Sequence, residues 1–190
     1  MSAAGRPVTG VLRAAVTLLR RHWRVAYLTS LVATLVNTVP DVLRQVLVWD
    51  DPRVAAAVAV DVLGFTTALI AQLWVTGALA DLPGTGRPAP GGALRRGTGL
   101  ARRAVRTAPA TVLGGVVCGG AVSALLTVPA SVAALGWDRV LGPLDAPGVG
   151  AFTVATVSDL VASAVTLPFL ALVLVLTAAG GRLSAAPAGQ

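Results

Sequence analysis

The sequence predicts an all-α integral membrane protein. We expect a four-span transmembrane helical bundle of two parallel two-span repeats, each preceded by a basic amphipathic helix at the membrane interface. Three observations predict this class: an apolar composition, four apolar stretches of spanning length, and one order of landmarks that occurs twice. Residues 1–190 then form a single membrane domain, with repeat one at about 8–80, a loop at 81–92, repeat two at about 93–181 and a tail at 182–190.

Composition places the chain in a lipid bilayer. Hydrophobic residues make up 55% of its 190 residues and charged residues 12%, with a mean hydropathy of +0.80. A soluble domain has about 25% charged residues. The 15 basic residues are all Arg and the 8 acidic residues are all Asp, which gives a formal net charge of +7. We expect this charge to act at the anionic inner leaflet and not on nucleic acid, because the arginines flank apolar segments.

A repeated motif divides the chain into two similar halves. The pattern Arg-Arg-x-x-Arg-x-Ala-x-x-Thr occurs at residues 20–29 and again at residues 102–111. Each copy is followed by an apolar run, a Val-Pro step, a Trp-Asp pair and a second apolar run with one aspartate, Asp61 or Asp159, near its start. The order is the same in both halves although the spacing drifts, which predicts one membrane unit used twice.

Four stretches are long and apolar enough to cross a membrane. A helix needs roughly 20 mostly apolar residues to span about 30 Å of hydrocarbon, where its backbone groups must be satisfied internally. The expected spans are Val25–Val48, Val54–Ala80, Thr107–Leu135 and Val149–Gly180. We expect Pro40, Pro129 and Pro168 to kink or end the helices that contain them.

Basic residues near the span ends set the expected orientation. Twelve of the 15 arginines lie before the first span, between the second and third spans, or in the tail, whereas Arg44, Arg53 and Arg139 lie on the other side. Because basic loops stay in the cytoplasm, we expect a multi-pass protein of the cytoplasmic (inner) membrane with both termini inside. Trp49 and Trp137 then fall at the outer interface, where aromatic rings anchor a span.

The segments before spans one and three are predicted to be helices on the membrane surface. Drawn as helices, residues 8–24 and 94–106 place apolar side chains on one side and arginines on the other. Their membrane-surface residues are Arg13, Arg20, Arg21, Arg24, Arg95, Arg96, Arg102, Arg103 and Arg106. These basic faces either enforce topology alone or recruit acidic lipid or an acidic partner.

Small and polar residues spaced four apart line one side of every span, and such rows let helices pack closely in lipid. The rows contain Gly64, Ala68 and Gln72 in span two, Gly115, Gly119 and Ser123 in span three, and Asn37 in span one. We expect the rows to pack the spans together. The alternative is that the same faces line a polar path.

A candidate polar site within the membrane contains Asp61 and Asp159, with Arg44, Asn37 and Gln72 as further members. An ionisable group within a bilayer costs about 3 kcal/mol or more and tends to mark an ion pathway, a relay or a buried pair. Two interpretations stay open. The aspartates handle protons or cations, or they cap helices, pair with arginine or meet water near the outer interface.

Neither catalysis nor metal or cofactor binding is expected of this chain. A serine nucleophile needs a base beside it, and the single histidine, His22, lies in the basic segment before the first span, far from Ser123 and Ser163 in the sequence. Neither Asp61 nor Asp159 follows the Gly-x-Gly that aspartyl intramembrane proteases use. The sequence also has no cluster of His, Cys and Glu that suits zinc, and no Gly-rich loop ending in Lys that suits a nucleotide.

One element in the middle of the chain is similar to a known family. A span ends at Gly77-Ala78-Leu79-Ala80-Asp81, and a turn at residues 86–88 (Gly-Arg-Pro) and the basic segment Ala93-Leu94-Arg95-Arg96 follow. This order resembles a bacterial integral membrane family similar to the membrane domain of glycerophosphodiester phosphodiesterases, in which the turn reads Gly-Arg-x-Pro. That family's activity belongs to a separate soluble barrel with His and Glu residues. The resemblance therefore implies a stand-alone membrane domain without the catalytic residues.

Together these observations favour a non-catalytic multi-pass membrane protein, an accessory or scaffold subunit that works with a membrane-protein partner. Short outer loops, two basic helices and Gly-rich faces are the basis of this expectation. The alternative is a small oligomeric transporter or self-protection (efflux or immunity) protein whose path contains Asp61 and Asp159.

Overall fold

A computed structural model of the protein describes residues 7–47, 53–140 and 148–185. All regular structure in these ranges is helical, so the predicted all-α class is confirmed. The helices are α1 (Val8–Arg21), α2 (Trp23–Leu47), α3 (Val54–Ala78), α4 (Leu82–Thr85), α5 (Ala93–Thr107), α6 (Pro109–Leu135), α7 (Trp137–Val140) and α8 (Val149–Ala185).

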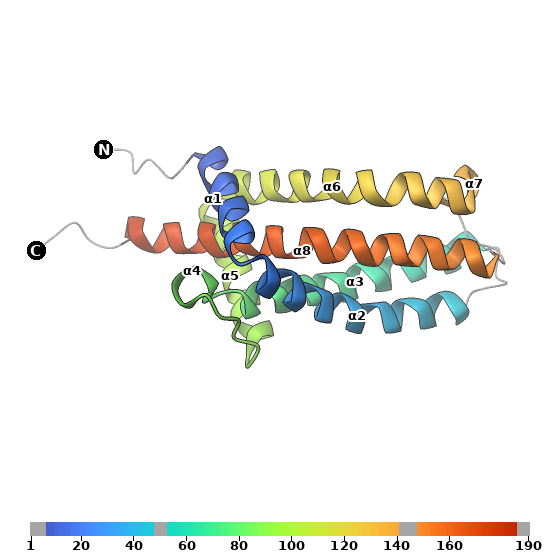
Figure 1. Cartoon of the computed structure of the whole chain (residues 1–190), viewed down its shortest axis with the longest axis horizontal. Coiled ribbons are helices and arrows are strands. Elements are labelled where there is room, and N and C mark those ends of the chain that lie inside the picture. Colours follow the sequence, from blue (N-terminus) through green and yellow to red (C-terminus); the bar gives the residue numbers. More distant parts are fainter. Residues whose placement is uncertain (1–6, 48–52, 141–147, 186–190) are drawn as a thin grey trace, which may run out of the picture.

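The long helices α2, α3, α6 and α8 run side by side along the length of the molecule (Figure 1). Helices α1, α4 and α5 gather at one end, called the basic end here, and α7 lies at the other, the far end (Figure 1). Helix α8 is central, because it contacts α1, α2, α3, α5 and α6. Helix α6 packs mainly on α8, whereas α2 and α3 pack on each other as well as on α8.

Three helices of the described chain are long and apolar enough to cross a membrane. They cover Val54–Thr85, Pro109–Leu135 and Val149–Gly180, and an 18-residue window within each has a mean hydropathy of 2.1, 1.9 and 2.4, respectively. By length and composition this is a membrane-embedded protein. Helix α2 has 25 residues but is not among the three, and its sequence contains Asn37, Asp41 and Arg44. A fourth crossing by α2 and the two-fold repeat therefore stay predictions.

Proline residues lie at the start of α6 and inside three of the long helices. The third span starts at Pro109 instead of the expected Thr107, because the preceding residue, Ala108, leaves the helical region at φ −150° and ψ 70°. A residue before proline disfavours helical geometry, while proline itself suits the first helical turn. Pro40, Pro129 and Pro168 lie inside α2, α6 and α8, and each helix continues through its proline.

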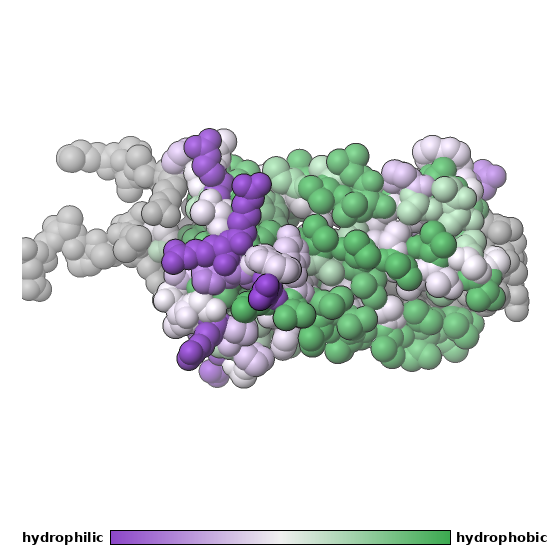
Figure 2. Space-filling view, viewed as in Figure 1, coloured by the Kyte–Doolittle hydropathy of each residue, from purple (hydrophilic) through white to green (hydrophobic). Residues whose placement is uncertain are grey.

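The best-buried side chains lie toward the basic end of the bundle. Val75 and Leu79 near the end of α3, Leu82 of α4, and Leu172 and Val173 of α8 are fully buried in one cluster. Toward the far end the large apolar side chains are exposed over most of the surface, and Figure 2 shows an apolar belt along the bundle with hydrophilic side chains concentrated at the basic end. Side-chain packing thus fixes the basic end more firmly than the far end.

Candidate functional site

The contact between α3 and α5 depends on two glycines. A Cβ atom added to Gly77 would overlap the carbonyl oxygen of Ala93 and lie 2.7 Å from the backbone nitrogen of Gly97. One added to Gly97 would overlap the carbonyl oxygen of Leu73 and lie 2.9 Å from the backbone nitrogen of Gly77. Because both obstacles are backbone atoms, α5 can reach this position only if both residues lack a side chain.

Arg96 fastens the loop between α3 and α5 to the end of α3. Its Nε and Nη2 atoms each donate to the Gly77 carbonyl oxygen at 3.3 Å, and its Nη1 atom donates to the Gly91 carbonyl oxygen at 2.6 Å. Nη2 also donates to the Ala89 carbonyl oxygen. The sequence predicts a membrane-surface residue here. In the structure Arg96 is half-buried and its guanidinium satisfies three backbone carbonyls, and its position at the membrane surface stays a prediction.

Next to this junction is a pocket of about 390 Å³ between the end of α3, α5 and α8. Arg95, Gly99 and Arg103 stand at successive turns of α5 and line it on one side. Its lining is completed by Arg96, Leu100, Ala80, Asp81, Val175 and Ala179. The pocket therefore combines two exposed guanidinium groups and one exposed carboxylate with an apolar wall.

Helix α5 reaches α8 through a second set of small contacts. Ala104 is fully buried against Leu174 and Ala178 of α8, with Leu100 and Ala101 packed beside them. The remaining arginines of α5, Arg102 and Arg106, are exposed. Helix α5 is therefore held on two sides by protein while its basic side stays accessible.

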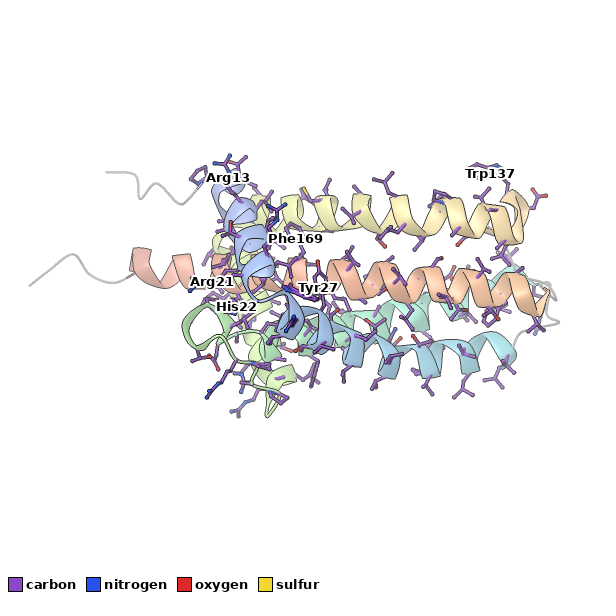
Figure 3. The ribbon with its side chains drawn as sticks, viewed as in Figure 1. Arg13, Arg21, His22, Tyr27, Trp137 and Phe169 are labelled. Atoms are coloured by element: carbon purple, nitrogen blue, oxygen red, sulfur yellow. The ribbon has the colours of Figure 1, made fainter. Side chains whose placement is uncertain are left out.

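Helix α1 presents its arginines in a similar way. Val11 and Ala15 are buried in the main cluster with residues of α8, while Arg13, Arg20 and Arg21 of α1 and Arg24 at the start of α2 are exposed. Figure 3 shows Arg13 and Arg21 at the basic end and Trp137 at the far end.

The link between α1 and α2 touches the turn after α4 and carries an aromatic contact. A Cβ on Gly86, which has φ +67°, would lie 3.1 Å from Cε1 of His22. The guanidinium of Arg24 lies 5.3 Å from the ring centroid of Trp23, within the range of a cation–π contact. His22 therefore packs against the turn at Gly86, in the segment between α4 and α5.

The predicted membrane site is dispersed over several helices. Asp61 on α3 and Asp159 on α8 are both exposed, and Asn37 on α2 lines a cavity of about 440 Å³ between α2 and α3. The Arg44 side chain lies outside the described part of the structure. Gln72 joins two helices: its Nε2 atom donates to the Leu167 carbonyl oxygen of α8 at 3.3 Å and to Thr76 Oγ1 at 3.2 Å.

The residues predicted to pack helices have different environments. Gly115 is buried, and a Cβ there would lie 2.9 Å from Cγ1 of Val173, so α6 approaches α8 closely at this point. Gly119 is also buried and Ser123 is half-buried, whereas Gly64 is half-buried and Ala68 is exposed. The row of α6 therefore faces protein at its start, and the row of α3 is open over the half farther from α5.

Sequence reasoning missed the Gly77–Gly97 contact and the pocket beside it. A signal was present, because Ala93, Gly97 and Ala101 form a row of small residues four apart, as helix–helix contacts in membranes often do. The arginines of this segment predict a helix at the membrane interface, and the small residues between them also form a contact with α3. The fully buried Ser30, whose hydroxyl has no hydrogen-bond partner among the described residues, was missed as well.

The described ranges contain no group of three or more His, Cys or Asp side chains that could hold a metal ion. The arrangement offers guanidinium groups, one carboxylate and apolar surface at the basic end. Comparison of this chain with protein-family models, with curated proteins and with solved structures finds no match in any of the three.

Proposed function

We propose that this chain is a non-catalytic multi-pass membrane protein that serves as an accessory or scaffold subunit of a membrane complex. In this proposal α2 is a fourth span, both termini are cytoplasmic, and the basic end lies at the inner leaflet. The observation that carries the proposal is an uncovered face on the half of α3 farther from α5, formed by Asp61, Gly64 and Ala68 and called the Asp61 face here.

The three residues of the Asp61 face share one side of the helix, because they are three and four residues apart. Asp61 and Ala68 are exposed and Gly64 is half-buried. Asp61 follows the first residue of α3 by seven positions, about 10 Å along the helix axis. A carboxylate facing hydrocarbon costs about 3 kcal/mol, and a partner helix with a donor opposite Asp61 would remove that cost.

The small residues of the Asp61 face would let such a helix approach the backbone of α3 closely. Coverage of the spans supports a partner as well. In the most apolar 18-residue window of each span, 12% of the residues are buried in the α3 span and 17% in α6, against 44% in α8. Helices α3 and α6 therefore leave most of their surface to lipid or to another protein.

The arginines of α1 and α5 support the orientation, because positive residues are retained on the cytoplasmic side. The resemblance to the membrane domain of glycerophosphodiester phosphodiesterases is consistent with a non-catalytic role, since the soluble barrel of those proteins is the part that carries activity. The partner is therefore expected within the membrane. Contact with the anionic inner leaflet is expected at the basic end.

The alternative is an oligomeric transporter or self-protection protein. Asp61 and Asp159 are both exposed in the single chain, so a path that contains them would have to form between copies. An assembly made of this chain alone would favour that alternative, and an assembly with a different protein would favour the scaffold.

The test compares two substitutions on α3. The tagged protein is transferred from native membranes into nanodiscs, and co-purifying proteins and the mass of the assembly are measured by mass spectrometry. Ala68→Phe blocks the Asp61 face and should reduce the recovered amount of a stoichiometric partner several-fold. The control, Leu69→Phe, lies one residue further on and about 100° around the helix, and it should not change that recovery. Equal recovery of the partner with both variants would refute the Asp61 face as the docking surface.

A second pair of substitutions separates the two functions. The double variant Asp61→Asn with Asp159→Asn retains hydrogen-bonding capacity but removes both charges. A scaffold should remain assembled and functional in this variant, whereas an ion-coupled transporter should lose its ion dependence in a vesicle transport assay. Transport that keeps its ion dependence would exclude the aspartates as a relay.

A further inference from the structure

We propose that the pocket lined by Arg95, Gly99 and Arg103 binds the headgroup of a phosphatidylglycerol-type lipid, an anionic phospholipid whose headgroup also carries hydroxyl groups. This pocket is called the α5 pocket below. The inference goes beyond the proposed function, because it concerns a ligand at the basic end and not a partner on the Asp61 face.

The spacing of the two arginines suits a phosphate. Arg95 and Arg103 are eight residues apart on α5, about 12 Å along the axis, with Gly99 at the midpoint of the same side. Both long side chains can converge over the glycine, where a Cβ would have no neighbour within 4 Å. One guanidinium group can donate two parallel N–H hydrogen bonds to a pair of phosphate oxygens. Two guanidinium groups above a glycine, which has no side chain, therefore form a binding site for phosphate.

Differences between adjacent arginines strengthen this assignment. The guanidinium of Arg96 is occupied by the carbonyls of Gly77, Ala89 and Gly91. Arg95 and Arg103 are exposed, and no protein acceptor within the described ranges binds them. Arg96 and the two glycines of the α3–α5 contact thus hold α5 in place, while Arg95 and Arg103 remain available to a ligand.

The wall and position of the α5 pocket favour a lipid over a free phosphate. Leu100 on α5 and Val175 and Ala179 on α8 supply an apolar side, along which an acyl chain can run toward the apolar belt. The pocket lies at the basic end, where hydrophilic side chains border that belt (Figure 2). Basic pockets between membrane helices on the cytoplasmic side are a recurrent setting for anionic headgroups.

Asp81 explains why the headgroup should carry hydroxyl groups. Its exposed carboxylate lines the same pocket and accepts hydrogen bonds without donating any. A bare phosphate monoester would be repelled by it. A headgroup whose phosphate meets the arginines and whose hydroxyl groups donate to Asp81 satisfies all three side chains.

The experiment measures lipid retention by the purified full chain. The protein is reconstituted in nanodiscs of phosphatidylcholine with a minor fraction of phosphatidylglycerol, released into mild detergent, and bound lipids are counted by native mass spectrometry. Arg95→Gln with Arg103→Gln should reduce retained phosphatidylglycerol about a hundredfold, because each of the two lost charge-assisted contacts weakens binding about tenfold. The matched control, Arg13→Gln with Arg20→Gln on α1, removes the same charge and should change retention less than twofold.

A second variant keeps every charge. Gly99→Leu fills the floor of the α5 pocket, where a Cβ has no neighbour within 4 Å, and it should also lower retention about tenfold while circular dichroism stays that of the native protein. Equal losses from the α1 and α5 double variants, or undiminished retention by Gly99→Leu, would overturn the proposal in favour of general surface charge.

Two further measurements identify the source of the phosphate and the role of Asp81. Soluble glycerol phosphate, added to the detergent at millimolar concentration, should fail to displace the lipid, and displacement would overturn the assignment to a membrane lipid. Asp81→Asn should reduce the preference for phosphatidylglycerol over phosphatidic acid, which lacks the headgroup hydroxyls. An unchanged preference would overturn the part assigned to Asp81. All of these readouts are independent of any protein partner, so they can fail while the proposed function holds.

Discussion

The basic end and the far end of this bundle are stabilised by different means. At the basic end, Gly77 and Gly97 bring two backbones into contact, Arg96 satisfies three carbonyls, and Leu79 and Leu172 are fully buried. Toward the far end α3 is exposed on most sides, as Phe65 with 73% exposure illustrates. The difference indicates that one end is complete within a single chain, while the other depends on lipid or on another protein.

The largest effect expected at the basic end comes from Gly97→Ala. Its Cβ would meet the backbone of Leu73, so α5 must move away from α3, which should lower the free energy of unfolding by about 3 kcal/mol. Thermal unfolding in nanodiscs measures the change. Gly99→Ala, two residues on in the same helix with open space around it, is the control and should be neutral or slightly stabilising. Similar losses in both variants would show that the contact is looser than described.

Arg96→Gln tests whether the loop between α3 and α5 is held by its guanidinium. The substitution removes donors to the carbonyls of Gly77, Ala89 and Gly91. It should lower the free energy of unfolding by about 2 kcal/mol, because these are charge-assisted hydrogen bonds. Arg102→Gln, on the same helix but exposed, should change stability by less than about 0.5 kcal/mol. Hydrogen exchange at residues 86–97 would locate the loss. Unaltered exchange there would contradict the tie assigned to Arg96.

Gln72→Leu measures the polar link between α3 and α8. It removes the hydrogen bond to the Leu167 carbonyl with little change of volume. We expect the free energy of unfolding to fall by about 0.6 kcal/mol, the usual contribution of such a hydrogen bond within a membrane. Thr66→Val is the control, because Thr66 bonds within its own helix. If Gln72→Leu lowers the free energy of unfolding more than Arg96→Gln does, the strongest polar contact lies in the middle of the bundle and not at the basic end.

Phe65→Ala should have the smallest effect on the isolated chain. The side chain is 73% exposed, so its removal should alter the free energy of unfolding by less than about 0.5 kcal/mol. If the native assembly covers this half of α3, the same substitution should destabilise the complex although it leaves the purified single chain unchanged. Comparison of melting temperatures in the two preparations would separate these cases.

Much of the fold follows from local pattern. The apolar runs that predict spans two, three and four correspond to α3, α6 and α8, because length and hydropathy are properties of contiguous residues. The basic segments correspond to α1 and α5 for the same reason, since helical period is visible in one stretch of chain. The arrangement of the predicted site could not be predicted in the same way. Asp61 and Gln72 lie on α3 and Asp159 lies on α8, and the rotation of one helix relative to another is not encoded in the local pattern of either segment.

The sequence by itself determined the helical class, the apolar spans and the concentration of arginine beside them, because these depend on composition and on spacing along the chain. Only the tertiary structure decided that Arg96 binds carbonyls while Arg95 and Arg103 border a pocket. Adjacent residues of one type acquire different roles there because the close approach of α5 to α3 at Gly77 and Gly97 buries one side of α5 and leaves another open. That approach depends on which two backbones meet, and spacing along the chain does not contain this information.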